Sequence, residues 1–259
     1  MEKAHPSAQH HRGAAMDNIV AGQSGSTMGA FIPPQCALCA RAPLCHPESE
    51  GHPQRISAPV HAQRFIRCGE SIYRAGDPMV NLYQLRSGSA KIRITNPSGL
   101  EQITAFPIAG ALLGLDGIET GLHTCDAIAL EDSLLCILPY AELLTHCHHF
   151  NGAAQLFNRM MAHDANQHCR LLLTLGCMTT EERIAGFLIG ISEQMAANGY
   201  SPLAFTLKMT REDIANHLGM KVETVCRVLA RLQEASMVKV SRRQLEISDV
   251  DALRQMSCG

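Results

Sequence analysis

Hydrophobic residues come in short runs between about Arg64 and Leu138. Turn-forming groups such as Ala-Gly-Asp-Pro at 75–78 and Asn-Pro-Ser-Gly at 96–99 separate these runs. The runs with the length and content of strands are 81–85, 90–95, 102–106, 127–130 and 133–138. Many short strands at near-regular spacing predict a β-sandwich or a barrel-like roll.

The pattern changes after Pro139. Between Phe150 and Leu175 there is no proline, and apolar residues recur at a helical spacing. Asp164 and His168 interrupt this stripe, and a polar break lowers the stability of a helix pair while it fixes the register. We interpret the segment as a dimerisation helix; the alternative is a core helix packed on the roll. The positions expected to face a partner are Met161, Ala165, His168 and Leu172.

The segment TREDIANHLGMKVETVCRVLARLQ, at 210–233, has the spacing of a helix-turn-helix. Thr210 can cap the first helix, with Asp213 three residues on completing a capping box. Ala215 is small where two helices would touch, Gly219 accepts the positive φ of a tight connector, and Val225 would pack the second helix on the first. The apolar runs at 238–240 and 245–247, around a turn at 241–243, predict a wing hairpin.

The second helix of this motif would enter the major groove of DNA. Glu223 can accept a hydrogen bond from a cytosine amino group, and Arg227 can donate two to guanine. Their alternative role is an ion pair between residues four positions apart on a helix surface. Lys208, Arg211 and Lys221 are better placed for phosphate groups.

Charge agrees with this interpretation. The chain has 259 residues and a formal charge of −2, but between Thr206 and Leu245 eight Lys and Arg face four acids, a net charge of +4. A basic region in a mildly acidic chain is typical of a DNA-binding module. No paired acid and base or activated nucleophile is recognisable, so we do not expect an enzyme.

The hydropathy of the chain indicates where in the cell the protein is expected. No run approaches the roughly 18 to 20 apolar residues of a membrane span. Residues 1–35 lack the pattern of a signal peptide, and their low hydrophobic periodicity predicts a flexible tail. We therefore expect a cytoplasmic protein with no membrane partner, in a compartment where thiols stay reduced.

Three of the eleven cysteines, Cys36, Cys39 and Cys45, lie within ten residues of loop-like sequence. Most of the others are isolated and are expected to be small buried hydrophobes. The cluster is compatible with an iron–sulfur site, with a zinc site that includes His46, or with redox-active or inert thiols. The residues themselves leave these chemistries open.

A β-roll, a long helix and a winged helix-turn-helix in this order resemble the cyclic AMP receptor protein superfamily, and most closely its oxygen-sensing branch, the fumarate and nitrate reduction regulators (FNR). The segments that carry the resemblance are GLDGI at 114–118, SLLCILP at 133–139, EERIAGF at 181–187, TREDIANHLG at 210–219 and VETV at 222–225. It implies an α+β fold with four parts. These are a flexible tail (1–35), a cluster loop with a cyclic-nucleotide-binding-like β-roll sensor domain (36–149), a dimerisation helix (150–177) and a winged helix-turn-helix DNA-binding domain (178–259).

The resemblance also implies a ligand set. Cyclic-nucleotide binders of the superfamily carry Arg-Ser/Thr-Ala in the roll, where this chain has Thr124-Cys125-Asp126, so a cyclic nucleotide is not expected. The N-terminal C-x2-C-x5-C of the oxygen-sensing branch is present as Cys36, Cys39 and Cys45. Its distant fourth cysteine aligns with Cys136, with Cys125 as the alternative. Four such thiolates suit a [4Fe–4S] cluster.

Members of this branch are thought to dimerise and bind DNA in the cluster-bearing form and to be inactivated by oxygen. The resemblance thus implies a homodimer on double-stranded DNA with inverted TTGAT-type half-sites, and RNA polymerase as a further partner. Cys226 stands where the family's recognition helix has serine, and a thiol is a weaker hydrogen-bond partner than a hydroxyl. The alternative is a thiol- or zinc-dependent or nucleotide-gated regulator without a cluster.

Overall fold

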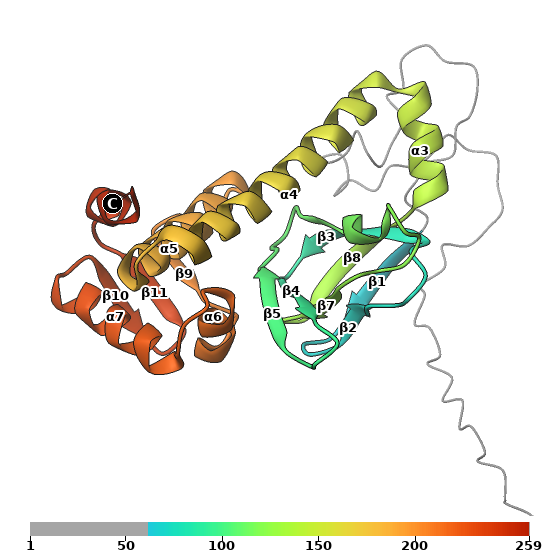
Figure 1. Ribbon diagram of the computed structural model, residues 1–259. Coiled ribbons are helices and arrows are strands. Elements are labelled where there is room, and N and C mark those ends of the chain that lie inside the picture. Colours follow the sequence, from blue (N-terminus) through green and yellow to red (C-terminus); the bar gives the residue numbers. More distant parts are fainter. Residues whose placement is uncertain (1–61, 259) are drawn as a thin grey trace, which may run out of the picture.

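A computed structural model describes residues 62–258 of the chain (Figure 1). The expected tail at 1–35 and the cysteines Cys36, Cys39 and Cys45 lie outside the described residues. None of the described helices is long and apolar enough to cross a membrane.

Two four-stranded antiparallel sheets form the roll, with strand orders β1-β8-β3-β6 and β2-β7-β4-β5. The strands are β1 (Ala62–Ile66), β2 (Ser71–Tyr73), β3 (Asn81–Ser87), β4 (Ala90–Thr95), β5 (Glu101–Ala105), β6 (Leu112–Leu113), β7 (Asp126–Ala129) and β8 (Ser133–Pro139), with a short 3-10 helix η1 (Leu115–Gly117). Ile66, Leu85 and Leu135 pack between the sheets. The predicted roll is therefore present, and its strands agree with the predicted runs to within two residues; β1, β2 and β6 were not predicted as separate strands.

Strand β8 is buried on both faces. Leu135 points into the roll, whereas Cys136 and Leu138 lie against the helices that follow the strand. Successive residues of a strand point to opposite sides, so a central strand that is covered on both faces is nearly continuously apolar. This explains the sequence Leu-Leu-Cys-Ile-Leu at 134–138.

A helix that we did not predict, α3 (Tyr140–His149), follows β8 directly. The long helix α4 (Asn151–Cys177) comes next, and at 1.5 Å per residue it is about 40 Å long. Its first turns are anchored on the roll by Ala153, Phe157 and Met160, and the rest extends toward the second domain (Figure 1). The predicted long helix is therefore confirmed, within two residues at its end.

The second domain contains α5 (Thr180–Ala197), β9 (Ala204–Thr206), α6 (Arg211–His217), α7 (Val222–Glu234), β10 (Val238–Ser241), β11 (Gln244–Ile247) and α8 (Val250–Cys258). Strands β10, β11 and β9 form a small sheet, so the predicted wing is present. Ile214, Val225 and Leu229 contribute to the core beneath α7. We did not predict α8, which packs on α5.

Candidate nucleic-acid interface and metal site

The first helix of the helix-turn-helix, α6, begins with a complete capping box. The backbone N–H of Asp213 donates to Thr210 Oγ1 at 3.0 Å, and the N–H of Thr210 donates to Asp213 Oδ2 at 3.0 Å. These bonds satisfy two N–H groups that a helix end otherwise leaves without partners. The predicted capping residues are thus confirmed.

The connector between α6 and α7 depends on Gly219, which has a φ of 59°. A Cβ atom at this position would lie 3.0 Å from Leu175 Cδ2 at the end of α4. Ala215 and Val225 are both buried where the two helices meet. The three predicted spacing residues therefore occupy the positions that the motif requires.

The recognition helix α7 separates its buried and exposed residues cleanly. Val225, Val228 and Leu232 face the core. The predicted base-reading residues Glu223, Cys226 and Arg227 are exposed, as is Lys221 just before the helix. Among the described residues no ion pair joins Glu223 to Arg227, and both side chains are exposed.

The other two predicted phosphate-binding residues have partners in the protein. Lys208 Nζ lies 2.8 Å from Glu131 Oε2, in the roll. Arg211 is half-buried, and its Nη2 donates to the carbonyl of Arg242 at 3.2 Å. Burial lowers the pKa of Arg211 below its ordinary value. Of the three residues, Lys221 is the exposed one without an ion pair to another described residue.

The wing adds two cations that we did not single out for DNA contact. Arg242 and Arg243 are exposed at the turn between β10 and β11, and Arg242 has a φ of 56°. The basic count between Thr206 and Leu245 included both, but only the fold shows that they lie at the tip of the wing. A basic wing tip can contact phosphate groups beside the helix in the groove.

Cys136 lies in the middle of β8 and is 6% exposed. The sheet places Gln63 of β1 and Gln84 of β3 directly beside it, in one row across the strands. Paired residues of antiparallel strands share a face, so both carboxamides lie on the side of the thiol. On that side the apolar neighbours include Leu143 of α3 and Phe157 and Met160 of α4.

Gln84 carries a polar atom that the described part of the chain does not satisfy. Gln84 is only 2% exposed, and its side-chain Oε1 has no hydrogen-bond partner among the described residues. An unsatisfied buried polar atom costs about 1–3 kcal/mol. The layer around Cys136 thus contains an acceptor that can take a further hydrogen-bond donor. Among the described residues there is no group of three or more potential metal ligands, because three of the four predicted ligands lie outside them.

Cys125, the alternative fourth ligand, lies in the roll core on the other side of β8. It is 3% exposed, and its Sγ is 4.0 Å from the hydroxyl of Tyr73. Burial, together with the nearby Asp116, raises the pKa of this thiol well above its ordinary value. Because a metal ligand must be a thiolate, this environment opposes the ligand form of Cys125.

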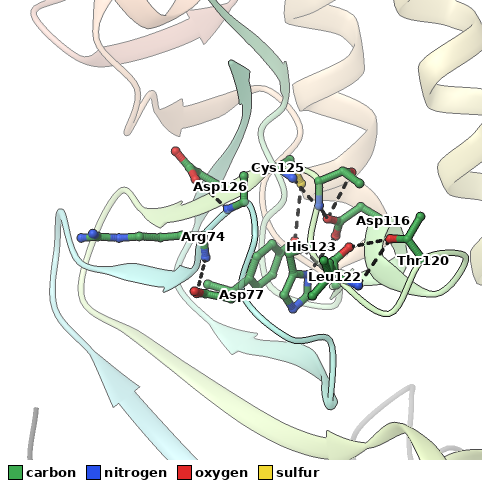
Figure 2. A network of polar contacts seen from close by, with 12 residues as sticks. Arg74, Asp77, Asp116, Thr120, Leu122, His123, Cys125 and Asp126 are labelled. Carbon is green, nitrogen blue, oxygen red and sulfur yellow. Dashed lines mark hydrogen bonds and ion pairs between the residues drawn. The ribbon is translucent and has the colours of Figure 1, made fainter. Parts of the chain in front are cut away.

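The segment 124–126 is part of a polar network of the roll that extends from buried to exposed residues (Figure 2). Asp116 accepts the N–H groups of Thr124 and Cys125, at 2.7 and 3.3 Å, and lies 3.4 Å from Nδ1 of His123. The ring of His123 stacks on Tyr73 with 3.8 Å between centroids. An anionic ligand at this position would therefore meet a carboxylate already bonded to the backbone.

Asp126 completes this region of the network. It accepts the N–H of Ala75 at 3.0 Å and an N–H of Arg93 at 2.7 Å. Burial raises the pKa of Asp126, but the bonds from Arg93 and Ala75 outweigh burial and lower it. The guanidinium of Arg93 beside this segment is thus already paired with a carboxylate.

The predicted dimer-facing residues form an exposed row on the middle of α4. Met161 is 39% exposed and Leu172 is 71% exposed. Ala165 and His168 lie between them and are also exposed, and His168 Nδ1 is 2.9 Å from the carbonyl of Asp164. Their spacing of four, three and four residues places them on one face of the helix. This face is not covered by any other described part of the chain.

Comparison with known proteins places both domains in described families. Residues 63–149 match the family model of the cyclic nucleotide-binding domain, and residues 182–256 match that of the Crp-like helix-turn-helix domain. The chain is 33% identical over 223 residues to the transcriptional regulatory protein btr of Bordetella pertussis, covering 85% of this chain and 92% of that protein.

The fumarate and nitrate reduction regulatory protein of Escherichia coli strain K12 is 35% identical over 224 residues, which cover 86% of this chain and 90% of that protein. Among solved structures, FixK2 from Bradyrhizobium japonicum superimposes with a TM-score of 0.68 at 27% identity, covering 76% of this chain and 97% of FixK2.

Proposed function

The chain belongs to the CRP/FNR family of transcription regulators, and we propose from this that it is a cytoplasmic, homodimeric regulator that responds to oxygen through a [4Fe–4S] cluster. The DNA-binding part of the proposal is supported by α7 and the wing. Lys221, Glu223, Cys226 and Arg227 are all exposed around the start of α7, and the wing adds two arginines. Base edges are read by such residues at the start of a recognition helix, and phosphates by the flanking cations.

The position of Cys136 carries the oxygen-responsive part of the proposal. The thiol is held by a rigid strand and packs in one cluster with Phe157 and Met160, the residues that anchor α4. A ligand bond to this thiol would therefore act on the same packing that fixes the dimer helix. Cys125 has no such contact, because it lies in the inner core of the roll.

Cys36, Cys39, Cys45 and Cys136 are the residues that would hold the cluster, and a set of four thiolates is its usual ligation. When bound, a [4Fe–4S] cluster supplies an oxygen-labile link between these residues. The likeness to the Escherichia coli protein supports the assignment.

The chain's own residues would carry the response to α4. Met160 is buried beside Cys136, and its neighbour Met161 starts the exposed row that we propose as the dimer interface. Loss of the ligand bond would relax the packing around Met160, and the row at Met161, Ala165, His168 and Leu172 would lose its orientation. The partner would dissociate, because two helices must align their rows to pack.

The roll network argues against nucleotide gating. Tyr73, His123 and Cys125 fill the space around Asp116, and that carboxylate would repel a phosphate. We therefore propose no cyclic nucleotide as a ligand. RNA polymerase is a further proposed partner, on the family resemblance alone.

Anaerobic purification followed by iron and acid-labile sulfide analysis tests the sensor. About four irons and four sulfides per chain are expected from the proposed cluster, with loss of both in air. Operator affinity for an inverted TTGAT-type repeat should be high before exposure to air and should fall with the loss of iron.

Three results would contradict the proposal. Anaerobic protein that contains zinc in place of iron would support a zinc-dependent regulator. Iron-free protein whose operator affinity rises on addition of cyclic AMP would support a nucleotide-gated one. DNA binding that is equal with and without air would remove the oxygen response.

A further inference from the structure

The roll and the helix-turn-helix meet along the edge of a sheet. Strand β5 is the last strand of the sheet β2-β7-β4-β5, and α6 lies beside it (Figure 1). The outer edge of such a strand presents unpaired backbone N–H and C=O groups. What satisfies these groups is a side chain of the DNA-binding domain.

Asn216 of α6 bonds to β5 as a neighbouring strand would. Its Oδ1 accepts the backbone N–H of Ile103 at 2.6 Å, and its Nδ2 donates to the carbonyl of Glu101 at 2.9 Å. Gln102 returns the contact, since its Nε2 donates to the carbonyl of Asn216 at 2.7 Å. The reciprocal pair of carboxamides fixes both the position and the rotation of α6 against the strand.

A charged pair links the start of α6 to the roll. Lys91 Nζ of β4 lies 2.6 Å from Asp213 Oδ1, while Oδ2 of the same carboxylate accepts the N–H of Thr210 in the capping box. Burial raises the pKa of Asp213, but Lys91 and Thr210 outweigh burial and lower it. The carboxylate therefore holds the helix end and the roll at the same time.

Apolar contacts continue between these polar ones. Ile103 and Phe106, although they belong to the roll sequence, are members of the core cluster that contains Ile214 and Leu218 of the helix-turn-helix. The ring of His217 packs against Phe106 with 5.1 Å between centroids. The two domains thus share a small continuous core here, and α6 cannot rotate without breaking it.

A second tie holds the same motif to α4. Arg183 donates to the carbonyls of Leu175, at 3.0 Å, and Leu218, at 2.9 Å. If the bonds of Arg183 were the only link, the helix-turn-helix could still rotate about the end of α4. The contacts at β5 lie away from that point and prevent this rotation.

We propose that Asn216, Gln102 and the Lys91–Asp213 pair are positioning residues for DNA reading. They hold α6 on the roll, and α6 holds α7 through Ala215 and Val225, so they set the orientation of each recognition helix relative to the dimer helix. The inference rests on the proposed function as a dimer on an inverted repeat. It adds that the roll itself, through β5, determines the half-site spacing that the dimer accepts.

Binding to duplexes of varied spacing tests this inference. Two inverted TTGAT-type half-sites are separated by central sequences that differ by single base pairs, and anaerobic full-length protein is titrated against each. One base pair rotates a half-site by about 35° and moves it by about 3.4 Å. The wild type should prefer one spacing, and Asn216→Ala and Lys91→Ala should reduce that preference about tenfold, in the range of ordinary coupling energies.

Two further measurements separate positioning from damage to the fold. Glu212→Ala, at an exposed residue of the same helix, should keep the wild-type spacing preference. Hydrogen exchange at the Ile103 amide should become faster in Asn216→Ala, while the melting temperature of the DNA-binding domain stays within a few degrees of the wild type. Reduced binding at all spacings alike would indicate a purely structural role and would overturn the inference.

Two other outcomes distinguish failure of this inference from failure of the proposed function. Wild-type spacing preference in both variants would overturn the positioning role and leave the proposed function standing. Wild-type protein that binds no inverted repeat at any spacing would overturn the proposed function and this inference together.

Discussion

At the scale of single residues, the two buried thiols of the roll differ in the hydrophobic cluster that surrounds them. Cys136 packs against α4, whereas Cys125 packs with Tyr73 inside the roll. We expect Cys136→Ala to lose most of the iron and sulfide after anaerobic preparation, because one of four ligands is absent. Cys125→Ala should keep the wild-type content. Equal metal content in both variants, measured by iron and sulfide assay, would show that Cys136 is not a ligand.

Arg227 is expected to carry base recognition. A bidentate contact to guanine contributes about 1–3 kcal/mol of discrimination, so Arg227→Ala should weaken operator binding about 5- to 150-fold and relax the preference at one base pair. Arg231, one turn further on, is paired with Glu181 at 2.6 Å. Arg231→Ala is therefore the control, with an expected loss below about threefold. Fluorescence anisotropy with matched and mutated half-sites measures both, and equal losses would contradict the assignment.

At the scale of elements, the connector between α6 and α7 requires glycine for two reasons. Gly219 has a positive φ, and an added Cβ would lie 3.0 Å from Leu175 Cδ2. Gly219→Ala should thus lower the free energy of unfolding by about 1–3 kcal/mol. Gly190, in the interior of α5, has no positive φ, and no atom lies within 4 Å of the place that a Cβ would occupy there.

Gly190→Ala is the matched control, because alanine in a helix interior is about 1 kcal/mol more favourable than glycine. It should raise the free energy of unfolding. Urea titration of both variants gives the comparison, and a neutral effect of Gly219→Ala would mean that the connector can adopt another backbone conformation.

The middle of α4 is exposed along one row, and its role depends on a second chain. Leu172→Glu should leave the stability of the monomer nearly unchanged, because Leu172 is 71% exposed, but should prevent dimerisation by placing a charge in the row. Arg170 lies two residues away, about 200° around the helix. Arg170→Glu should therefore dimerise normally. Sedimentation of anaerobic protein distinguishes them, and a Leu172→Glu dimer would place the interface elsewhere.

At the scale of the whole molecule, the junction between the domains is expected to weaken in acid. Burial lowers the pKa of His217, and its bond to the carbonyl of Ile103 at 3.0 Å offsets this only in part. An unfolded histidine titrates near about 6.5. The unfolded chain therefore binds the proton more tightly. The stabilising contribution of neutral His217 is complete above about pH 6.5 and is lost as pH falls toward the folded pKa.

Between about pH 7 and 5.5, the free energy of unfolding of the wild type should fall more steeply than that of His217→Phe. Asp213, an acid at the junction on α6, has a lowered pKa and stays ionised over this range. It therefore does not contribute to the change of the free energy of unfolding with pH. His149→Phe, at an exposed histidine of α3, should keep the wild-type slope. Urea titrations at several pH values measure all three, and equal slopes would show that His217 stays accessible to protons.

Sequence reasoning succeeded where the signal is local. The capping box at Thr210, the glycine turn at Gly219 and the apolar face of α7 depend on residues within one or two turns of each other, so spacing alone predicts them. The helix α3 was missed because its apolar pattern is weak, with only Leu143 and His146 buried. The wing arginines were counted as charge but not placed.

What the sequence determined by itself is the order of the roll, the long helix and the winged helix-turn-helix, the family, and the residues that can carry the chemistry: the cysteines, the basic helix and the apolar row. The tertiary structure decided which of these residues act together. It placed Cys136 and Cys125 in different hydrophobic clusters, paired Lys208 with Glu131, and joined Asn216 to a strand more than 100 residues earlier. Contacts between residues so far apart depend on how the two domains pack, which no local spacing records.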